Sequence, residues 1–330
     1  MLTTASGSLA MRRREHGRKN CVDTILFMHT RSLCVIVALL LLTCAASTGD
    51  TPDSLVKAGD TPITIEFSEK VSDAFRKLVE DWVHDAGDAV LTVYDRYPVK
   101  QVTIKVQVSS FGRGVGGGVT FDGRLIKVRV APEVTRSILR SDWVMTHEMF
   151  HLGFPDTDHN WVGEGLSTYM EPLARARAGP LSAEEVWGSM IDGFPKGLPG
   201  AFDRGLDKTP TWGRTYWGGA LFWLLADIEI RKKTENHKSL DDALRAIAAE
   251  GGIGSSKWPE EKIFQRADAA IGLPILEELH ERLGAQPGTT DLGALWQQLG
   301  VSRNGSTVVF NDGAPLAGIR RALTSGKAKP

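Results

Sequence analysis

The sequence predicts an α+β fold in which a small mixed β-sheet lobe, with one histidine-bearing helix, is followed by a mostly α-helical lobe. Two observations support this prediction. Segments that alternate between apolar and polar residues, as half-buried strands do, are concentrated before residue 131, whereas most segments after residue 164 have a helical period. The chain has 330 residues, 42% of them hydrophobic and 24% charged, so it is long enough to bury a sizeable core.

Residues 1–49 are predicted to be a leader segment. The apolar run at residues 32–46 follows Arg31 and ends in small residues, as in a secretory signal, and is shorter than the roughly 20 residues that span a membrane. We therefore expect an exported protein, periplasmic or extracellular, whose mature chain has no membrane span. Translation from Met28 would leave a more compact leader. The alternative is a membrane-anchored lipoprotein, because Leu41-Leu-Thr-Cys44 resembles a box that would carry a lipid anchor on Cys44.

A linker is predicted at residues 50–61, where Thr, Asp and Pro gather, and an α+β lobe at residues 62–158. Strand-like alternation and helix-like periods follow one another along this lobe. The predicted strands are residues 63–67, 102–108 and 124–130, and the predicted helices run from a Ser68 cap to about residue 93 and from residue 143 to 152, before Gly153 and Pro155.

The helical lobe is predicted over residues 159–330, and it would complete a site begun in the first lobe. Its first helix, at residues 164–178, is closed by Gly179 and Pro180, which are typical helix terminators. Further helices are predicted at residues 183–191, 215–234, 240–249, 260–270, 275–283 and 292–299, and one strand at 307–310.

The segment His147-Glu148-Met-Phe-His151 predicts a zinc site. Residues four apart on a helix lie about 40° apart around the axis and about 6 Å apart along it, so both imidazoles can reach one ion. Catalytic zinc takes three protein ligands, and Glu164 is the natural third. Glu148 lies near the open position, where a carboxylate can take a proton from zinc-bound water. We expect one Zn²⁺ ion, held by nitrogen and oxygen ligands because all three cysteines lie in the leader.

The run Gly112-x-Gly114-x-x-Gly117 matches a dinucleotide-binding pattern but lacks its context. That pattern needs a helix to open at the third glycine, whereas the sequence continues as strand. We interpret the run as a bulged or closely approached edge strand, to which a substrate backbone could add, or as a plain flexible loop.

The two motifs together, His-Glu-x-x-His and the later Trp161-Val-Gly-Glu164-Gly, resemble the gluzincin metallopeptidases, in particular the aminopeptidase N-like and glycyl aminopeptidase-like families. The resemblance covers about residues 60–235. It implies a thermolysin-like catalytic domain, with His147, His151 and Glu164 as zinc ligands and Glu148 as the general base. It also implies that Tyr216, which precedes a small-residue helix, donates to the oxyanion. The Gly-x-Met-Glu-Asn strand that holds a free α-amine in these enzymes is replaced by residues 116–120, which contain no glutamate.

We therefore predict a zinc metallopeptidase that acts on peptides or proteins, as an aminopeptidase or an endopeptidase. A catalytically idle zinc- and peptide-binding protein of the cell envelope is the alternative. No nucleic-acid partner is expected, because the net charge is −1 and the basic residues are scattered. Of the other polar residues, His159 could line a cleft, and Glu171 could accept a hydrogen bond from a ligand imidazole or lie on the surface.

Overall fold

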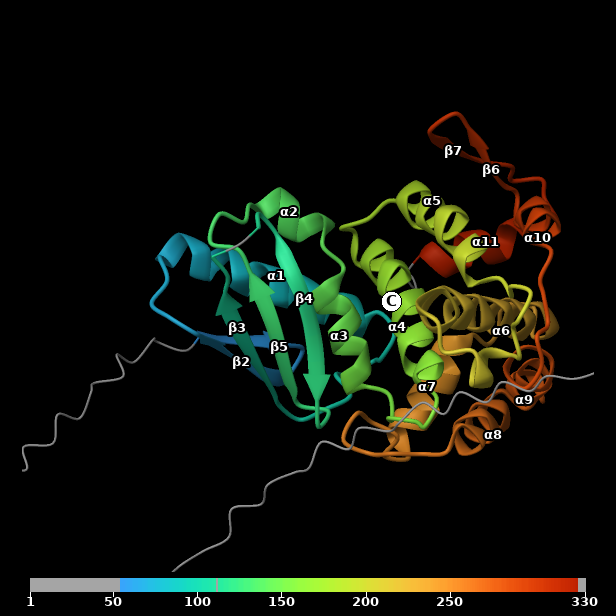
Figure 1. The fold of residues 1–330 in the computed structure, drawn as a ribbon, viewed down its shortest axis with the longest axis horizontal. Coiled ribbons are helices and arrows are strands. Elements are labelled where there is room, and N and C mark those ends of the chain that lie inside the picture. Colours follow the sequence, from blue (N-terminus) through green and yellow to red (C-terminus); the bar gives the residue numbers. More distant parts are fainter. Residues whose placement is uncertain (1–53, 111, 326–330) are drawn as a thin grey trace, which may run out of the picture. The chain divides into compact units, whose positions relative to one another are not determined.

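A five-stranded sheet organises the first part of the chain. The structure, a computed structural model, describes residues 54–110 and 112–325 (Figure 1). The predicted leader, with Met28 and Cys44, lies outside these residues. The strands are β1 (Ser54–Ala58), β2 (Thr61–Phe67), β3 (Val102–Val108), β4 (Val115–Phe121) and β5 (Leu125–Val130), in the order β1-β2-β3-β5-β4. The sheet is mixed, as predicted, because β2, β3 and β5 run parallel while β1 and β4 pair antiparallel with their neighbours.

One face of the sheet forms the core of this part of the chain. Alternate residues of β2, β3 and β5 are buried, among them Ile63, Ile104 and Ile126, while the residues between them are half-buried or exposed. Helices α1 (Asp73–Leu91) and α3 (Val144–Leu152) contact the sheet and one another, and the short α2 (Arg136–Ser141) packs on α1. The α+β prediction is therefore confirmed for this region.

Two predicted features of this region are wrong. Helix α1 is capped by Ser72, whose Oγ accepts a hydrogen bond from the Phe75 amide at 3.2 Å, whereas Ser68 Oγ accepts from the Val108 amide instead. Residues 54–61 fall within the predicted linker, but they form β1, a two-residue turn and the first residue of β2. The sequence does not predict β1, because its five residues form a strand through their pairing with β2 and not through a pattern of their own.

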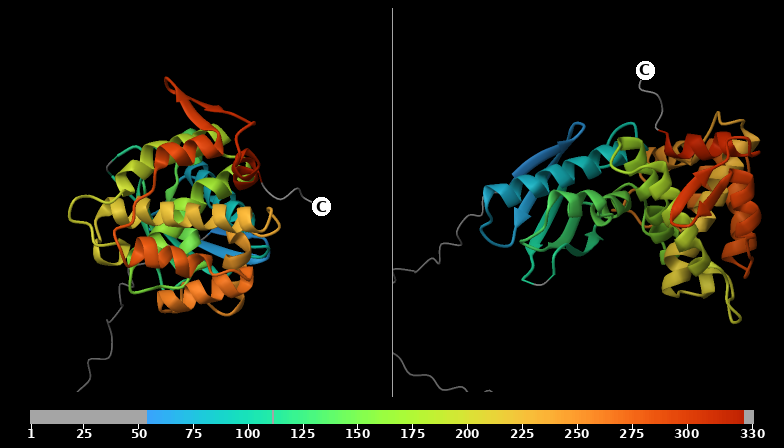
Figure 2. Two further views of the ribbon diagram at one scale, coloured as in Figure 1. Left: turned by 90° about the vertical axis from the view of Figure 1, so that its right-hand side faces the viewer. Right: turned by 90° about the horizontal axis from the view of Figure 1, so that it is seen from above.

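Helices dominate the chain from residue 160 onward (Figures 1 and 2). A short hairpin of β6 (Val301–Asn304) and β7 (Thr307–Phe310) projects from them, and β6 was not predicted. In the described residues no helix is long and apolar enough to cross a membrane. The helices are α4 (Asn160–Ala178), α5 (Ala183–Gly193), α6 (Gly219–Lys233), α7 (Leu240–Ala249), α8 (Glu260–Ile271), α9 (Ile275–Leu279), α10 (Leu292–Leu299) and α11 (Ala317–Thr324).

Two predicted helices each consist of an α-helix and an adjoining π-helical segment. The helix expected at residues 215–234 is α6 preceded by a π-helical segment, Gly213–Gly218, and the helix expected at residues 275–283 is α9 followed by a second π-helical segment, His280–Gly284. A π-turn inserts one extra residue without changing the apolar period on either side, so sequence periodicity does not reveal it.

Candidate metal centre

Helix α3 presents two histidines from the floor of a cavity. Its first turn is fixed by Asp142, whose Oδ1 accepts a hydrogen bond from the Val144 amide at 2.9 Å, and it ends at Gly153. His147 and His151 lie one turn apart on the same side of this helix, with ring centroids 5.0 Å apart. Helix α4, which contacts α3, presents Glu164 from its second turn.

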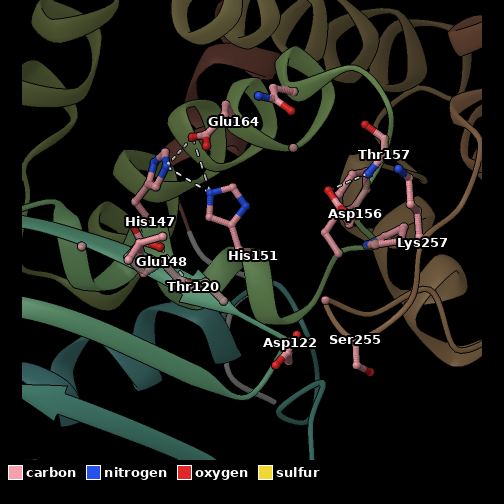
Figure 3. Close-up of a pocket in the computed structure, with 18 of the residues that line it drawn as sticks. Thr120, Asp122, His147, Glu148, His151, Asp156, Thr157, Glu164, Ser255 and Lys257 are labelled. Carbon is pink, nitrogen blue, oxygen red and sulfur yellow. Dashed lines mark hydrogen bonds and ion pairs between the residues drawn. The ribbon is translucent and has the colours of Figure 1, made fainter. Parts of the chain in front are cut away.

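The three predicted ligands converge (Figure 3). His147 Nε2 lies 3.0 Å from Glu164 Oε2, His151 Nε2 lies 3.5 Å from the same oxygen, and the two Nε2 atoms are 3.3 Å apart. Among the described residues, this is the group whose donor atoms lie close enough together to hold a metal ion. Structure and sequence therefore bring the same three side chains to one point.

The donor set fits a zinc ion. With metal–ligand distances of about 2.0–2.1 Å, neighbouring donors of a tetrahedral site lie about 3.3–3.4 Å apart. The three separations given above bracket that value. Two imidazole nitrogens and one carboxylate oxygen also form the mixed donor set typical of a catalytic site, which leaves a fourth position open.

Electrostatics favour the metal-binding forms of Glu164 and His147, but not of His151. Burial would raise the pKa of Glu164, but the hydrogen bonds from His147 and His151 hold this pKa well below its ordinary value, so the carboxylate is ionised. Burial lowers the pKa of His147, which therefore stays neutral. Burial opposes protonation of His151 as well, yet its contact with Glu164 raises the pKa of this imidazole.

Glu148 lies against the edge strand β4. The Thr120 hydroxyl is 2.8 Å from Glu148 Oε2 and 2.9 Å from the Glu148 carbonyl oxygen. Gly118 makes this approach feasible, because a Cβ at that position would lie 2.7 Å from both Glu148 Cγ and a Val144 methyl. Glu148 is 7% exposed. The carboxylate is therefore held between helix and strand at the border of the cavity.

The glycine run forms a bulged edge strand, one of its two predicted interpretations. The register of β4 against β5 shifts between Val115 and Gly118, and Gly117 has a positive φ of 113°. No helix opens at the third glycine, so the dinucleotide pattern has no structural counterpart. The other edge of β4 has no strand partner among the described residues.

Tyr216 lies beside the two histidines. Its ring stacks on His147 with 6.3 Å between centroids, and it belongs to the π-helical segment before α6. Burial, and then the charges of Glu164 and Glu148, raise the pKa of its hydroxyl, so the phenol stays protonated and able to donate. The structure thus places Tyr216 at the centre, where the family resemblance put it.

A cavity of about 670 Å³ contains all of these groups. It is bounded by β4, the β4–β5 turn, α3, the start of α4 and the loop at residues 254–257. Glycines bring these backbones together, since a Cβ on Gly123 would lie 2.2 Å from the Ser255 nitrogen and one on Gly254 would lie 2.3 Å from the His151 carbonyl oxygen. The charged side chains Asp156 and Lys257 lie beyond His151 as seen from His147 (Figure 3).

Two weaker candidates lie outside the centre. His159 pairs with Glu260 at the start of α8 and does not line the cavity. Glu171 is buried and bonds Arg175 at 2.6 Å, so it neither supports a ligand imidazole nor lies on the surface. Sequence reasoning did not identify Thr120, because its contact with Glu148 depends on how β4 and α3 pack. It also missed Trp143, whose position four residues before His147 on the same helix could have indicated their ring contact.

Comparisons with known proteins show the fold. No protein-family model and no curated protein sequence matches this chain. The structure is similar to that of an aminopeptidase N family protein from Idiomarina loihiensis, with a TM-score of 0.57 and 14% identity over 77% of this chain and 50% of that chain. It also matches an M1 zinc metallopeptidase from Deinococcus radiodurans, with a TM-score of 0.47 and 15% identity over 73% and 52% of the two chains.

The chain thus spans about half the length of these structures. The similarity to the Idiomarina protein confirms, for the fold, the resemblance to aminopeptidase N-like proteins that the motifs indicated.

Proposed function

We propose that this chain is a zinc-dependent metallopeptidase with a thermolysin-like catalytic fold. The observation that carries the proposal is the convergence of His147, His151 and Glu164 next to the Glu148 carboxylate, inside one cavity. The similarity of the fold to that of an aminopeptidase N family protein supports it by analogy.

Zinc would be held by His147, His151 and Glu164. When bound there, it supplies Lewis-acid polarisation of a carbonyl group and lowers the pKa of a water molecule. All three ligand side chains line the cavity, as does β4, so a substrate carbonyl can approach them from the side of β4.

The chain's own residues supply proton transfer and charge stabilisation. Glu148 would take the proton of the attacking water and pass it to the leaving amine. Thr120 holds the Glu148 carboxylate in place during both transfers. Tyr216 would donate its hydroxyl proton in a hydrogen bond to the carbonyl oxygen as that oxygen becomes negative.

The free edge of β4 would bind the substrate backbone. This edge has no strand partner among the described residues, residues 117–120 of β4 line the cavity, and residues 116–118 have no side chains to obstruct an added strand. A peptide bound there would run past Glu148 and the candidate metal ligands. Peptides and unfolded protein segments are therefore the proposed substrates.

The test is digestion of a peptide library by the full chain, with and without a chelator, read by mass spectrometry. We expect chelator-sensitive cleavage, which Glu148→Gln reduces by about 10²–10⁴-fold while stoichiometric zinc is retained. Glu133→Gln changes an exposed glutamate that does not line the cavity, so this matched control should cleave like the wild type.

Equal hydrolysis by Glu148→Gln and the wild type would remove the mechanism. Absence of cleavage by a zinc-loaded wild type would favour the idle zinc- and peptide-binding protein. The cleavage positions also distinguish an aminopeptidase from an endopeptidase.

Export is a separate proposal, supported by the leader at residues 1–49. Fractionation of cells that express the full chain tests it, with a periplasmic, extracellular or membrane-anchored location expected. A cytoplasmic protein with an intact leader would contradict it.

A further inference from the structure

We infer that Trp143 and Trp212 form a subsite for an aromatic or large apolar side chain of the substrate, next to the bond that is cut. The inference rests on the proposed peptidase function and names the substrate class that this particular chain would prefer.

The two tryptophans extend an aromatic row that passes over the candidate metal centre. Trp143 meets the His147 ring edge-on at 5.1 Å between centroids. Tyr216 stacks on His147 at 6.3 Å, and Trp212 lies 6.2 Å beyond Tyr216. Trp143 also borders the cavity. Trp212 does not itself line the cavity, and its contact with Tyr216 joins it to the aromatic side chains that do.

Trp143 and Trp212 are more exposed to solvent than the other tryptophans. The chain has nine tryptophans, all within the described residues, and seven of them are buried or half-buried. Trp143 and Trp212 are 50% and 62% exposed. Leaving such large apolar rings in water forgoes the free energy of burying them, roughly 25 cal/mol for each Å². Exposed aromatic rings that gather at a cavity are typical of binding surfaces.

The charge distribution of the cavity favours an uncharged occupant at this end. The charged side chains that are not part of the centre, Asp122, Asp156 and Lys257, lie toward the β4–β5 turn and the loop beyond His151 (Figure 3). The end at His147 presents aromatic rings. A phenylalanine, tyrosine or leucine side chain would gain apolar contact there, and a carboxylate would lose hydration without a partner.

The position along the substrate follows from chain geometry. An extended peptide advances about 3.3 Å for each residue, and its side chains alternate between two sides. The Trp143 ring lies 5.1 Å from the ring of a candidate ligand, so a residue that flanks the scissile bond can reach it. A residue three or four positions away cannot.

The first experiment compares peptides that differ only at a residue flanking the cleaved bond, Phe against Ala and Lys. We expect the wild type to cleave the Phe peptide with at least tenfold higher kcat/KM. Trp143→Ala and Trp212→Ala should each reduce this preference several-fold, while Trp143→Phe largely restores it. Phe202→Ala is the matched control, since Phe202 is 95% exposed and no aromatic contact joins it to the row.

The second experiment measures binding and does not need turnover. In a Glu148→Gln background, zinc-loaded protein is titrated with the Phe and Ala peptides, and intrinsic tryptophan fluorescence gives Kd. The Phe peptide should bind more tightly, and Trp143→Ala should remove most of the difference.

Different results would contradict the proposed subsite and the proposed peptidase function. Chelator-sensitive cleavage with an unchanged preference in Trp143→Ala and Trp212→Ala would overturn the subsite alone. A preference for Lys over Phe would overturn it too, because the rings would then be binding a cation. Loss of all hydrolysis in the wild type, with Phe-selective binding retained, would overturn the peptidase function and leave the subsite standing.

Discussion

Thr120 can hold Glu148 in both of its protonation states. When the carboxylate is ionised, the Thr120 hydroxyl can donate to Oε2. When it is protonated, the hydroxyl can donate to the Glu148 carbonyl oxygen and accept from the carboxylic acid. A general base must take up and release a proton without moving away from its substrate. In the proposed mechanism, Thr120 would therefore position Glu148 throughout that cycle.

The substitution Tyr216→Phe tests whether the Tyr216 hydroxyl stabilises the oxyanion. The ring stack on His147 would remain, and only the hydroxyl would be lost. We expect kcat to fall by about 10²–10³-fold with little change in KM, since the lost hydrogen bond would form mainly in the transition state. Steady-state kinetics on one defined peptide measures both constants.

Tyr97→Phe is the control for this substitution. The Tyr97 hydroxyl is buried and has no hydrogen-bond partner in the described structure, so its removal should leave activity unchanged. A Tyr216→Phe variant as active as Tyr97→Phe would contradict the oxyanion assignment.

Residues in the centre differ in how far sequence reveals them. His147, Glu148 and His151 lie within one helical turn and a half, so helix geometry alone fixes their relative positions. Glu164 follows after a short loop, which limits where it can be. Thr120 reaches the centre through the packing of β4 on α3, and no spacing in the chain encodes that contact. Trp143 lies four residues before His147 on the same helix, so helix spacing could have indicated the contact between their rings.

At the scale of elements, the close crossing of α4 and α6 sets the distance between Glu164 and Tyr216. Helices α4 and α6 approach at Gly165 and Gly219. A Cβ on Gly165 would lie 2.5 Å from Gly219 backbone atoms, and one on Gly219 would lie 2.4 Å from the Trp161 carbonyl oxygen. Glu164 immediately precedes the first of these glycines and Tyr216 lies just before the second, so the crossing positions both side chains.

Gly165→Ala should therefore separate the two helices. The added methyl group meets backbone rather than a flexible side chain, so we expect a loss of about 1–3 kcal/mol in the free energy of unfolding, or more. Activity should fall as well, because Tyr216 moves relative to Glu164. Thermal denaturation and peptide hydrolysis are measured on the same preparation.

Gly318→Ala in α11 is the matched substitution, since a Cβ there meets open space. It should leave activity intact and the melting temperature unchanged or slightly raised. A Gly165→Ala variant as stable and active as Gly318→Ala would show that the crossing tolerates the extra volume.

Element boundaries were predictable where a local signal existed. The helices at residues 143–152, 240–249 and 292–299 have clear apolar periods, and the structure has them within one residue. Strand β1 depends on its neighbour β2, and the π-helical segment before α6 depends on tight backbone packing, such as Gly213 against the Lys196 carbonyl oxygen. Contacts between distant segments of this kind do not change the apolar periodicity of the sequence, so they cannot be predicted from it.

At the scale of the whole described chain, the candidate centre joins its two kinds of structure. Helix α3 packs on the sheet and carries two of the candidate ligands, while α4 packs on α6 and carries the third. The sequence predicted this division into a sheet-rich part followed by a helical part, because periodicity changes along the chain. It could not predict the strand order, in which β5 lies between β3 and β4, since pairing across a sheet is decided by contacts distant in sequence.

Metal binding should consequently stabilise the whole fold. A ligand that binds only the native state adds RT ln(1 + [L]/Kd), about 2.7 kcal/mol at one hundred times Kd, so zinc should raise the melting temperature of chelator-treated protein by several degrees. Glu164→Gln should lose most of this shift, because the carboxylate ligand is replaced by a weakly coordinating amide. His84→Gln, in which an exposed histidine far from the centre is changed, should keep it. Calorimetry with and without zinc measures all three proteins, and a shift of equal size in Glu164→Gln and wild type would mean that the ion binds elsewhere.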